Sequence, residues 1–589
     1  MKSILAISCI FALHAVFTDA GPRHLNTFVE TRSGPVQGFV NSTTGVVNFL
    51  GIPYAQPPIG AFRFQPAVYV QPWADVLNAT AFGPVSVQAP LPPPKEAILH
   101  QGILENQSED SLNLNIWTPN ADNRKRAVML YIHGGAALTG AGSFPWHNGQ
   151  NTVSEGDVVY VTINYRLNAF GWIQLSTVDP TDFPDTTNLG ISDQMTALKW
   201  VYNNIECEYH CHPCFPPIYR ILASTSYSRS TSTIAFGGDS KRITLVGHSA
   251  GSLSIATLLS IPKARKYIRR AIIESLPWTM QAPPSYARNT ALAFLSALNL
   301  TAETAKAIYT LDVPTILSTT VKVATSNTNF IDSLIPYTIV VDGKEIAEAP
   351  LQYLIKNPPR GIDILHGINY NEFDFWTQFI SGWFTQTEEQ AIGYFNQTFS
   401  HGSAAYEIFK NALPPGTPPY AIVDRMGTDV LFRAGTWQFV EQLASVGIHA
   451  YTYQFGYRSN AFNNTLGACH EIISPFTRDN VVAYEQLGSA LPGNGPLPTQ
   501  YEKERLAKTL VATWTSFAKN GNPNNQLIPH WPAYDRVRRN VMMFAHDSTG
   551  YDIGTNVVQR DPDHVLREAW RTTLHEWLLT GLEKLVNYH

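Results

Sequence analysis

A serine between two glycines is the residue best placed to do chemistry in this chain. Ser249 lies in the sequence Gly247-His248-Ser249-Ala250-Gly251. The apolar run 243–246 leads into it, and residues 255–260 follow with helical character. A strand, a sharp turn and a helix in this order form a nucleophile elbow, which holds a serine hydroxyl at the edge of a sheet. A structural glycine turn is the alternative, but the flanking strand and helix favour a nucleophile.

A serine hydroxyl needs partners before it can attack a carbonyl carbon. A base must take its proton, and an acid must orient that base. Around a nucleophile elbow these partners follow the serine along the chain, the acid first and the histidine second. The chain holds 17 histidines, so an ordinary surface or core histidine is the alternative to each candidate base.

The elements expected around Ser249 alternate between strand and helix. Residues 127–132 and 158–163 are short apolar runs, and residues 192–204 have helical spacing. Nearly continuous apolar strands alternating with helices are typical of a parallel sheet that is covered on both faces. The local pattern therefore predicts an α/β protein with Ser249 at the end of a central strand.

Further ordered motifs extend over nearly the whole chain. They are Phe49-Leu-Gly51-Ile-Pro53-Tyr-Ala55, Arg63-Phe64, Glu109-Asp110-Ser-Leu112, His133-Gly134-Gly135, Asn164-Tyr165-Arg166-Leu167, Asn188-Leu-Gly190-Ile-Ser-Asp193, Phe236-Gly-Gly-Asp239, Trp514-x-x-Phe517-Ala518 and Asn520-Gly-Asn-Pro523. With the serine motif, this series resembles the type-B carboxylesterase/lipase family, the cholinesterase-like branch of the α/β-hydrolases. The resemblance implies an α/β-hydrolase fold with a large, mostly parallel central sheet and helices on both faces. It also implies ester hydrolysis without a cofactor or metal.

The resemblance assigns the two partners of Ser249. The family's acid follows a short strand in a Gly-x-x-x-x-Glu setting, which here is Gly367 to Glu372. Its base follows a Gly-x-x-His setting, which here ends at His470. Asp374 is the competing acid. In this assignment Glu372 accepts a hydrogen bond from one ring nitrogen of His470, which leaves the other nitrogen to take the serine proton.

An oxyanion hole is implied by the same resemblance. The donors are the backbone N–H groups of Gly135, Ala136 and Ala250, whose small side chains let a carbonyl oxygen approach closely. The family often has a third glycine where Ala136 stands, and alanine keeps the N–H group. A plain strand-to-loop turn is the alternative. Two buried ion pairs carry over as structural features, namely Arg63 with Glu109 and Arg166 with Asp193.

Some positions depart from the family's pattern. Ser86 and Ser111 occupy the two places where the family commonly has a disulfide, so the loop 89–108 is expected to be looser. That loop has no Trp for a quaternary ammonium group, and His248 stands where cholinesterases have an acidic residue. These differences disfavour choline esters. We interpret His248 as a wall residue of the substrate gorge and expect Glu471 to point elsewhere.

The composition is that of a globular enzyme. The 589 residues are 44% hydrophobic and 15% charged, with 41 basic and 46 acidic residues and a formal charge of -5. Without a block rich in Lys and Arg, the sequence gives no support to nucleic-acid binding. Residues 21–589 are expected to form a single catalytic domain. The expected partner is a small-molecule or lipid ester, and the oligomeric state stays open.

The N-terminus has the features of a secretory signal peptide. Residues 1–20 combine a basic start, a mostly apolar run and a small-residue end. A buried N-terminal helix is the alternative. We expect a secreted protein with no stable membrane anchor, because no later stretch resembles a membrane span or a lipid-anchor tail. Six N-x-S/T sequons fit this route: Asn41, Asn78, Asn106, Asn299, Asn396 and Asn463.

Residues 206–233 interrupt the family pattern just before the motif that begins at Phe236. They carry Cys207, Cys211 and Cys214 with neighbouring histidines. The spacing matches iron–sulfur ligation in radical enzymes, which lack the hydrolase motifs found here, and a zinc knot is another metal alternative. A surface excursion with a local disulfide is a third. We favour translated non-coding sequence, such as a retained intron, because excision restores the family's spacing.

These observations predict a secreted serine carboxylic ester hydrolase that acts through an acyl-enzyme. A triacylglycerol or sterol-ester lipase of the same family is the alternative within this class. A non-catalytic, cholinesterase-like adhesion domain is the alternative of another class, and it would have lost Ser249 or one of its partners.

Overall fold

The protein is known here from a computed structural model. It describes residues 25–90, 98–99, 106–206, 235–326, 337–378, 380–493, 498–545 and 555–572. The expected signal peptide, most of the loop 89–108 and the three clustered cysteines lie outside these residues.

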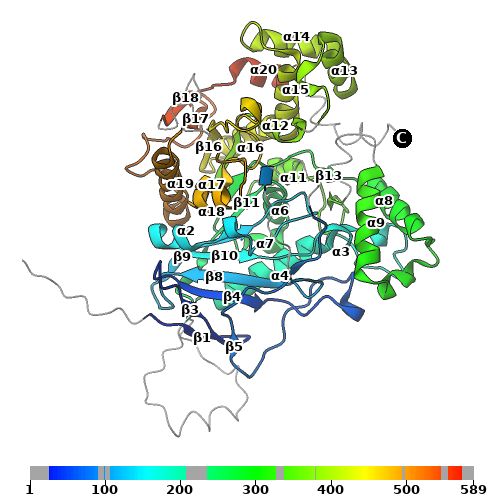
Figure 1. Cartoon of the computed structure of the whole chain (residues 1–589), viewed down its shortest axis with the longest axis vertical. Helices are drawn as coiled ribbons and strands as arrows, with labels where there is room; N and C mark the ends of the chain where they lie inside the picture. The colour runs from blue at the N-terminus through cyan, green and yellow to red at the C-terminus, as the bar shows by residue number, and fades with distance from the viewer. Residues whose placement is uncertain are drawn as a thin grey trace, which may run out of the picture.

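One large sheet organises the described part of the chain (Figure 1). Its strand order is β18-β17-β16-β15-β12-β11-β9-β10-β8-β4-β3. The seven strands from β17 to β10 in this order run parallel, whereas β8, β4, β3 and β18 join by antiparallel pairing. The strands are β3 (Phe39–Val40), β4 (Val47–Pro53), β8 (Asn113–Thr118), β9 (Arg126–Ile132), β10 (Val159–Ile163), β11 (Gly238–His248), β12 (Arg270–Glu274), β15 (Asp363–Asn369), β16 (Ala450–Phe455), β17 (Asn540–Phe544) and β18 (Val557–Arg560).

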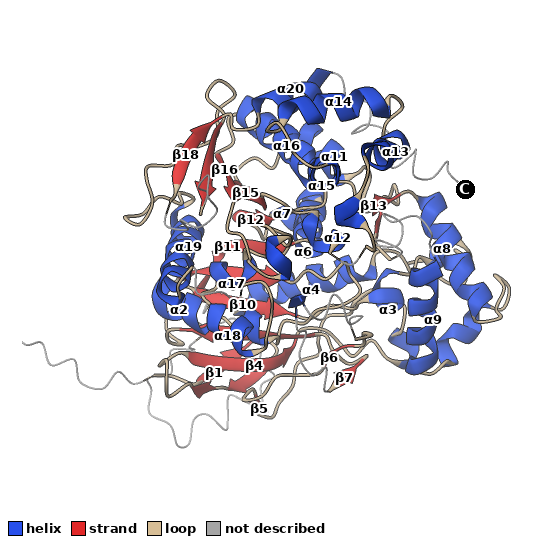
Figure 2. Ribbon diagram, turned by 45° about the horizontal axis from the view of Figure 1, so that its top comes forward, coloured by secondary structure: helices blue, strands red, loops and turns tan. Residues whose placement is uncertain are grey.

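Helices cover both faces of this sheet, as Figure 2 shows. One layer contains α2 (Gln150–Gly156), α17 (Ser474–Thr477), α18 (Val481–Gln486) and α19 (Gln500–Asn520). The other contains α3 (Asn168–Trp172), α4 (Leu189–Asn204), α6 (Ala250–Ser260), α7 (Pro262–Arg265), α11 (Pro350–Lys356) and α16 (Ala434–Ser445). The predicted mostly parallel sheet with helices on both faces is confirmed.

The alternating side chains of the central strands explain the two layers. Along β9, Val128, Leu130 and Ile132 belong to the core shared with α4 and α6. Met129 and Tyr131 belong to the second core, which includes residues of α19. Successive side chains of a strand point to opposite faces, so a strand buried on both sides is apolar throughout. This is why residues 127–132 read as one uninterrupted apolar run.

Further helices lie beside the sheet and frame its carboxyl edge. They are α8 (Pro284–Ala297), α9 (Val313–Ser326), α12 (Asp374–Thr377), α13 (Glu388–Thr398), α14 (Gly402–Ala412), α15 (Pro419–Thr428), the π-helix η6 (Asp429–Arg433) and α20 (His564–Thr572). Short strands form small additional sheets: β1 (Phe28–Thr31), β2 (Gly34–Gln37), β5 (Leu77–Asn78), β6 (Val85–Ser86), β7 (Gln107–Ser108), β13 (Gln281–Ala282) and β14 (Ile339–Val340). None of the helices within the described ranges is long and apolar enough to cross a membrane.

The flanks of the interrupting segment lie side by side. The N–H of Gly238 donates to the carbonyl of Ile205 at 3.3 Å. The carboxylate of Glu206 accepts hydrogen bonds from Ser240 N and Ser240 Oγ and lies 2.6 Å from Lys125 Nζ. Glu206 is therefore built into the fold, and residues 207–234 lie outside the described residues.

Candidate active site

Ser249 stands at the turn between β11 and α6. Its backbone has φ 57° and ψ −124°, a conformation that L-residues seldom adopt. The two glycines are required by close packing. A Cβ on Gly251 would lie 2.0 Å from the Ile132 carbonyl oxygen, and one on Gly247 would lie 2.8 Å from the carbonyl carbon of Gly251. The strand, the turn and the helix thus have the geometry of the predicted nucleophile elbow.

Strand β12 fastens this turn. Ser249 N donates to the Glu274 carbonyl oxygen at 3.0 Å. The Ser252 hydroxyl donates to the same oxygen at 2.7 Å and accepts from Glu274 N at 2.9 Å. These hydrogen bonds hold the strained residue in place while its side chain remains partly exposed.

Glu372 and His470 form a hydrogen-bonded pair beside the elbow. His470 Nδ1 lies 2.7 Å from Glu372 Oε2, and both residues are buried. Glu372 Oε1 accepts from Asn369 N at 2.6 Å, and His470 N donates to the Glu372 carbonyl oxygen at 3.2 Å. Asp374, the competing acid, makes no hydrogen bond to His470 among the described residues. The two carboxylate oxygens of Glu372 are therefore fixed, one by the backbone and one by the imidazole.

The other ring nitrogen of His470 has no hydrogen-bond partner within the described residues. His470 and Ser249 line the same cavity, so this nitrogen and the serine hydroxyl belong to one site. Burial lowers the pKa of His470 and the neighbouring charge of His248 lowers it further, while Glu372 opposes the shift. A neutral imidazole at neutral pH is the form that can accept a proton.

The loop after β9 lies against the elbow. A Cβ on Gly134 would lie only 3.1 Å from Ser249 Cβ. Gly135, Ala136 and Ala137 all have positive φ, and the N–H groups of Leu138 and Thr139 fold back onto the Gly135 carbonyl oxygen. Over the described residues, the N–H groups of Gly135, Ala136 and Ala250 make no hydrogen bond. They are thus available as donors to a substrate oxygen.

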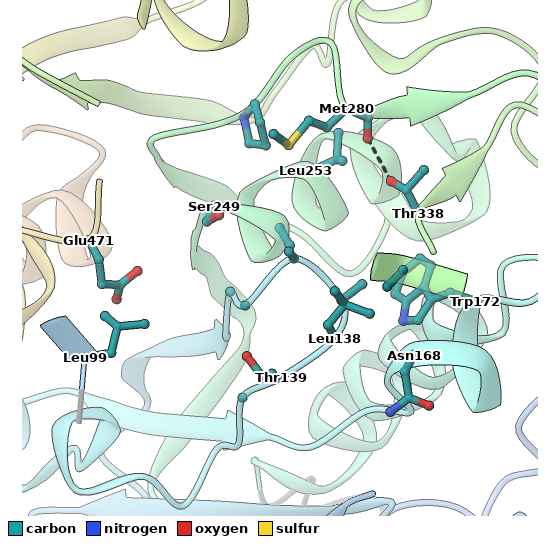
Figure 3. A pocket seen from close by; sticks show the side chains of 18 of the residues that line it. Leu99, Leu138, Thr139, Asn168, Trp172, Ser249, Leu253, Met280, Thr338 and Glu471 are labelled. Carbon is teal, nitrogen blue, oxygen red and sulfur yellow. Dashed lines mark hydrogen bonds between the residues drawn. The ribbon is translucent and has the colours of Figure 1, made fainter. Parts of the chain in front are cut away.

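The cavity has a volume of about 520 Å³ and a mainly apolar lining. Figure 3 shows Ser249 between Glu471 and Leu99 on one side and Met280 and Trp172 on the other. The lining comes from several elements: Ala89, Leu99, Leu138, Phe144, Trp146, Trp172, Leu253, Met280, Leu317, Val321, Ala324, Ile339, Phe375, Trp376, Phe432 and Glu471. Its size and lining suit the acyl and alcohol groups of an apolar ester.

Both expected structural ion pairs are present. Arg63 donates to both carboxylate oxygens of Glu109 at 2.7 and 2.6 Å. Arg166 Nη2 lies 2.6 Å from Asp193 Oδ1, and both side chains are buried. At the place of the expected missing disulfide, the hydroxyls of Ser86 and Ser111 are buried and lie 2.9 Å apart. The two serines thus join the same two segments by a hydrogen bond.

The positions of His248 and Glu471 differ from expectation. His248 is fully buried and does not line the cavity, whereas Glu471 does. His248 Nδ1 lies 2.6 Å from Glu471 Oε2. The two residues adjoin Ser249 and His470 in the sequence, but their pairing depends on how distant segments meet. No local pattern could have predicted it.

The described residues contain no group of three or more His, Cys, Asp or Glu side chains that could hold a metal ion. Cys207, Cys211 and Cys214, on which the metal alternatives depend, lie outside the described residues. Cys469 is a buried free thiol next to His470.

The fold and the elbow define a serine hydrolase of the α/β-hydrolase class. The model of the Carboxylesterase family matches residues 25–207 and 232–561, so the chain belongs to this family. The chain is accordingly a serine-type carboxylic ester hydrolase. The match is interrupted within the segment that the sequence analysis singled out.

Curated relatives and solved structures resemble the chain over most of its length. The para-nitrobenzyl esterase of Bacillus subtilis (strain 168) is 29% identical over 547 residues, which cover 92% of this chain and 97% of the relative. The liver carboxylesterase of Sus scrofa is 29% identical over 563 residues, which cover 88% of this chain and 89% of the relative. A crystal structure of a Geobacillus stearothermophilus carboxylesterase matches with a TM-score of 0.76 and 31% identity, covering 92% of this chain and 100% of that chain.

Proposed function

We propose that the protein hydrolyses carboxylic esters through an acyl-enzyme, using Ser249 as nucleophile, His470 as base and Glu372 as the orienting acid. The observation that carries the proposal is the 2.7 Å contact between Glu372 Oε2 and His470 Nδ1, because His470 lines the same cavity as Ser249. No cofactor enters the reaction.

The reaction proceeds in two halves. The Ser249 hydroxyl attacks the ester carbonyl carbon while His470 Nε2 takes the hydroxyl proton. The N–H groups of Gly135, Ala136 and Ala250 stabilise the oxyanion that forms. As the tetrahedral intermediate collapses, the carbon–oxygen bond breaks, and His470 gives its proton to the leaving alcohol. Water then attacks the acyl-enzyme with His470 again as base, which releases the acid and restores the serine.

The test is the Ser249→Ala variant with a short p-nitrophenyl ester. We expect hydrolysis to fall to a small residue of the original rate while the circular dichroism spectrum stays that of the folded protein. Ser154→Ala is a matched control, because Ser154 is exposed on α2 and does not line the cavity. Full activity in the Ser249→Ala variant would overturn the proposal, whereas a folded, unaltered protein that hydrolyses none of these esters would favour the non-catalytic adhesion alternative.

A lipase is the second candidate function. The wide apolar cavity favours it, since such a lining suits a long acyl chain or a sterol. Rates on p-nitrophenyl esters from acetate to palmitate, and on emulsified triacylglycerols, separate the two functions. A sharp preference for emulsified substrate supports a lipase, and a preference for short soluble esters supports a carboxylesterase.

We also propose that the protein is secreted and glycosylated. Asn78, Asn106, Asn299, Asn396 and Asn463 are exposed, and Asn41 is partly exposed, so every sequon is open to modification. The N-terminal segment 1–20 supports the same route. Mass spectrometry of protein recovered from the culture medium is the test: we expect residue 21 as the first residue and a mass decrease after enzymatic deglycosylation. An intact Met1 in the mature protein would contradict this proposal.

A further inference from the structure

A second histidine–carboxylate pair lies beside the first. His248 ends β11 immediately before Ser249, and Glu471 immediately follows His470. His248 Nδ1 and Glu471 Oε2 are 2.6 Å apart, so this contact joins the strand of the nucleophile to the loop of the base. The function proposed above uses neither side chain.

The pair packs directly on the imidazole of His470. The rings of His248 and His470 have centroids 4.6 Å apart and are tilted by 45°. Phe432 and Trp376 complete this enclosure, with centroids 5.1 and 5.0 Å from that of His470. Glu471 has φ 72°, a left-handed conformation that is strained for a side chain of this kind. Glu471 adopts this strained conformation at the point where its side chain contacts His248.

The charges around His248 favour its protonated form. Burial acts to lower the pKa of His248, but the carboxylate of Glu471, 2.6 Å away, outweighs burial and raises it. Glu274 on β12 and Glu372 act in the same direction. Burial acts to raise the pKa of Glu471, but His248 holds it well below its usual range. Both shifts favour the charged pair of an imidazolium and a carboxylate over the neutral forms.

The charges that face His470 come from three segments. His248 on β11 opposes its protonation, whereas Glu372 after β15 and the neighbouring Glu471 favour it. The rings that α12 and η6 contribute carry no charge. Arg478 Nη2 lies 3.7 Å from Glu274 Oε2, so its positive charge partly offsets the negative charge of Glu274 near His248 and Glu471. The protonation of His470 therefore depends on whether the charges of His248 and Glu471 are both present.

We propose that His248 and Glu471 are positioning residues for the ester hydrolysis proposed above, in which their ion pair fixes the imidazole of His470 between Glu372 and Ser249. The inference rests on the proposed roles of Ser249 and His470. Because the two charges act on His470 in opposite directions, the intact pair leaves the base neutral and fixed in place.

The opposing charges predict a shift in the pH profile that a purely structural role of the pair would not produce. In the His248→Gln variant, Glu471 keeps its charge without a partner. The pKa of His470 then rises, and the acid limb of the kcat/KM profile moves to higher pH by about one unit. In the double variant His248→Gln/Glu471→Gln both charges are absent, and we expect the acid limb to return toward that of the unaltered enzyme.

The Glu471→Gln variant provides a second measurement if His248→Gln does not fold. Without Glu471, burial is opposed only by Glu274 and Glu372, so the pKa of His248 falls and its charge is lost together with that of Glu471. We therefore expect the acid limb to stay near its original pH. The ring of His248 is no longer anchored, and kcat for a neutral ester falls about tenfold with KM changed less than about threefold. Unaltered kcat in a folded Glu471→Gln variant would overturn the proposal.

The matched control is His564→Gln. His564 also pairs with a carboxylate, at 3.1 Å from Asp561 Oδ2, but it is exposed on α20 and does not line the cavity. We expect its pH profile to coincide with that of the unaltered enzyme. An unshifted acid limb in His248→Gln, or an equal shift in the double variant, would overturn the inference. Such results leave the proposed function intact, since that depends on the Ser249→Ala variant.

Discussion

The conformation of Ser249 is imposed by its surroundings rather than by its own preference. A non-glycine residue in such a region of backbone space costs about 1–3 kcal/mol. Ser249 remains there because the Glu274 carbonyl oxygen accepts its N–H. Gly251 also packs closely against the end of β9, and Gly247 packs against Gly251. This backbone conformation directs the hydroxyl toward the cavity, so the strain is a consequence of how the nucleophile is placed.

The two acidic candidates near His470 differ in their environment. Glu372 is bonded to His470 Nδ1, whereas burial and the charge of Asp424 raise the pKa of Asp374 well above its usual range. Its surroundings therefore favour the protonated, neutral form of Asp374, which an amide imitates. Glu372, in contrast, must be an anion to stabilise the imidazolium that forms during catalysis.

These environments predict opposite outcomes for two amide substitutions. We expect Glu372→Gln to lower kcat by on the order of 10³- to 10⁴-fold, since the amide cannot stabilise a charged imidazole. Asp374→Asn should keep kcat within about threefold, because it removes no charge that the reaction uses. Steady-state kinetics on p-nitrophenyl butyrate measures both variants. A larger loss in Asp374→Asn would identify Asp374 as the acid.

At this scale the sequence could predict the nucleophile but not its surroundings. The motif around Ser249 is local, whereas Glu372 and His470 are 98 residues apart and were assigned only by family resemblance. They meet because β15 and β16 are neighbouring parallel strands whose carboxyl ends share one edge of the sheet. The contact of His248 with Glu471 also depends on how distant segments of the chain meet in the fold, so no local sequence pattern predicts it.

Among the elements, the buried central strands were the most predictable. The predicted runs 127–132 and 158–163 differ from β9 and β10 by one residue at the N-terminal end. Strand β11 begins at Gly238, earlier than the predicted apolar run 243–246. Its pairing with β9 shifts register between Gly238 and Ile243, and this additional part includes the exposed Lys241. The antiparallel edge strands β3, β4, β8 and β18 were not predicted.

The contacts of Glu206 predict how the chain behaves without the interrupting segment. Deleting residues 207–234 keeps Glu206, its ion pair with Lys125 and its hydrogen bonds to Ser240. Deleting residues 206–233 removes the same number of residues but replaces Glu206 with Ile234 at the junction. We expect both shortened proteins to be active and the first to be more stable by about 2 kcal/mol, because hydrogen bonds to a charged group are lost in the second.

Urea unfolding followed by tryptophan fluorescence measures this difference. Two inactive, unfolded deletion proteins would show that the segment belongs to the fold and would contradict the retained-intron interpretation. Peptides from residues 219–233 in the native secreted enzyme would contradict that interpretation as well. Equal stability of the two deletion proteins would show that Glu206 contributes nothing measurable.

At the scale of the whole molecule, the cavity is the feature that is hardest to predict from the sequence. Its lining combines the loop after β9, the elbow helix α6, the lateral helix α9 and the rings of α12 and η6. No two of these segments adjoin in the sequence. Family resemblance predicted a substrate gorge, but its lining is known only once these segments are placed together. Substrate choice is therefore a property of the assembled fold rather than of a motif.

Helix α9 offers a direct way to alter this cavity. Leu317, Val321 and Ala324 line one side of it from successive turns, so a large side chain at residue 324 should fill part of the space. We expect Ala324→Trp to lower kcat/KM for long-chain p-nitrophenyl esters by about tenfold or more relative to the acetate, because lost burial of a few methylene groups has that cost. Lys322→Trp is the matched control, since Lys322 lies exposed on the same helix and does not line the cavity. If Ala324→Trp lowers the rates on acetate and long-chain esters equally while Lys322→Trp lowers neither, the acyl chain does not extend toward α9, and the opposite side, near Leu99 and Glu471, must accommodate it.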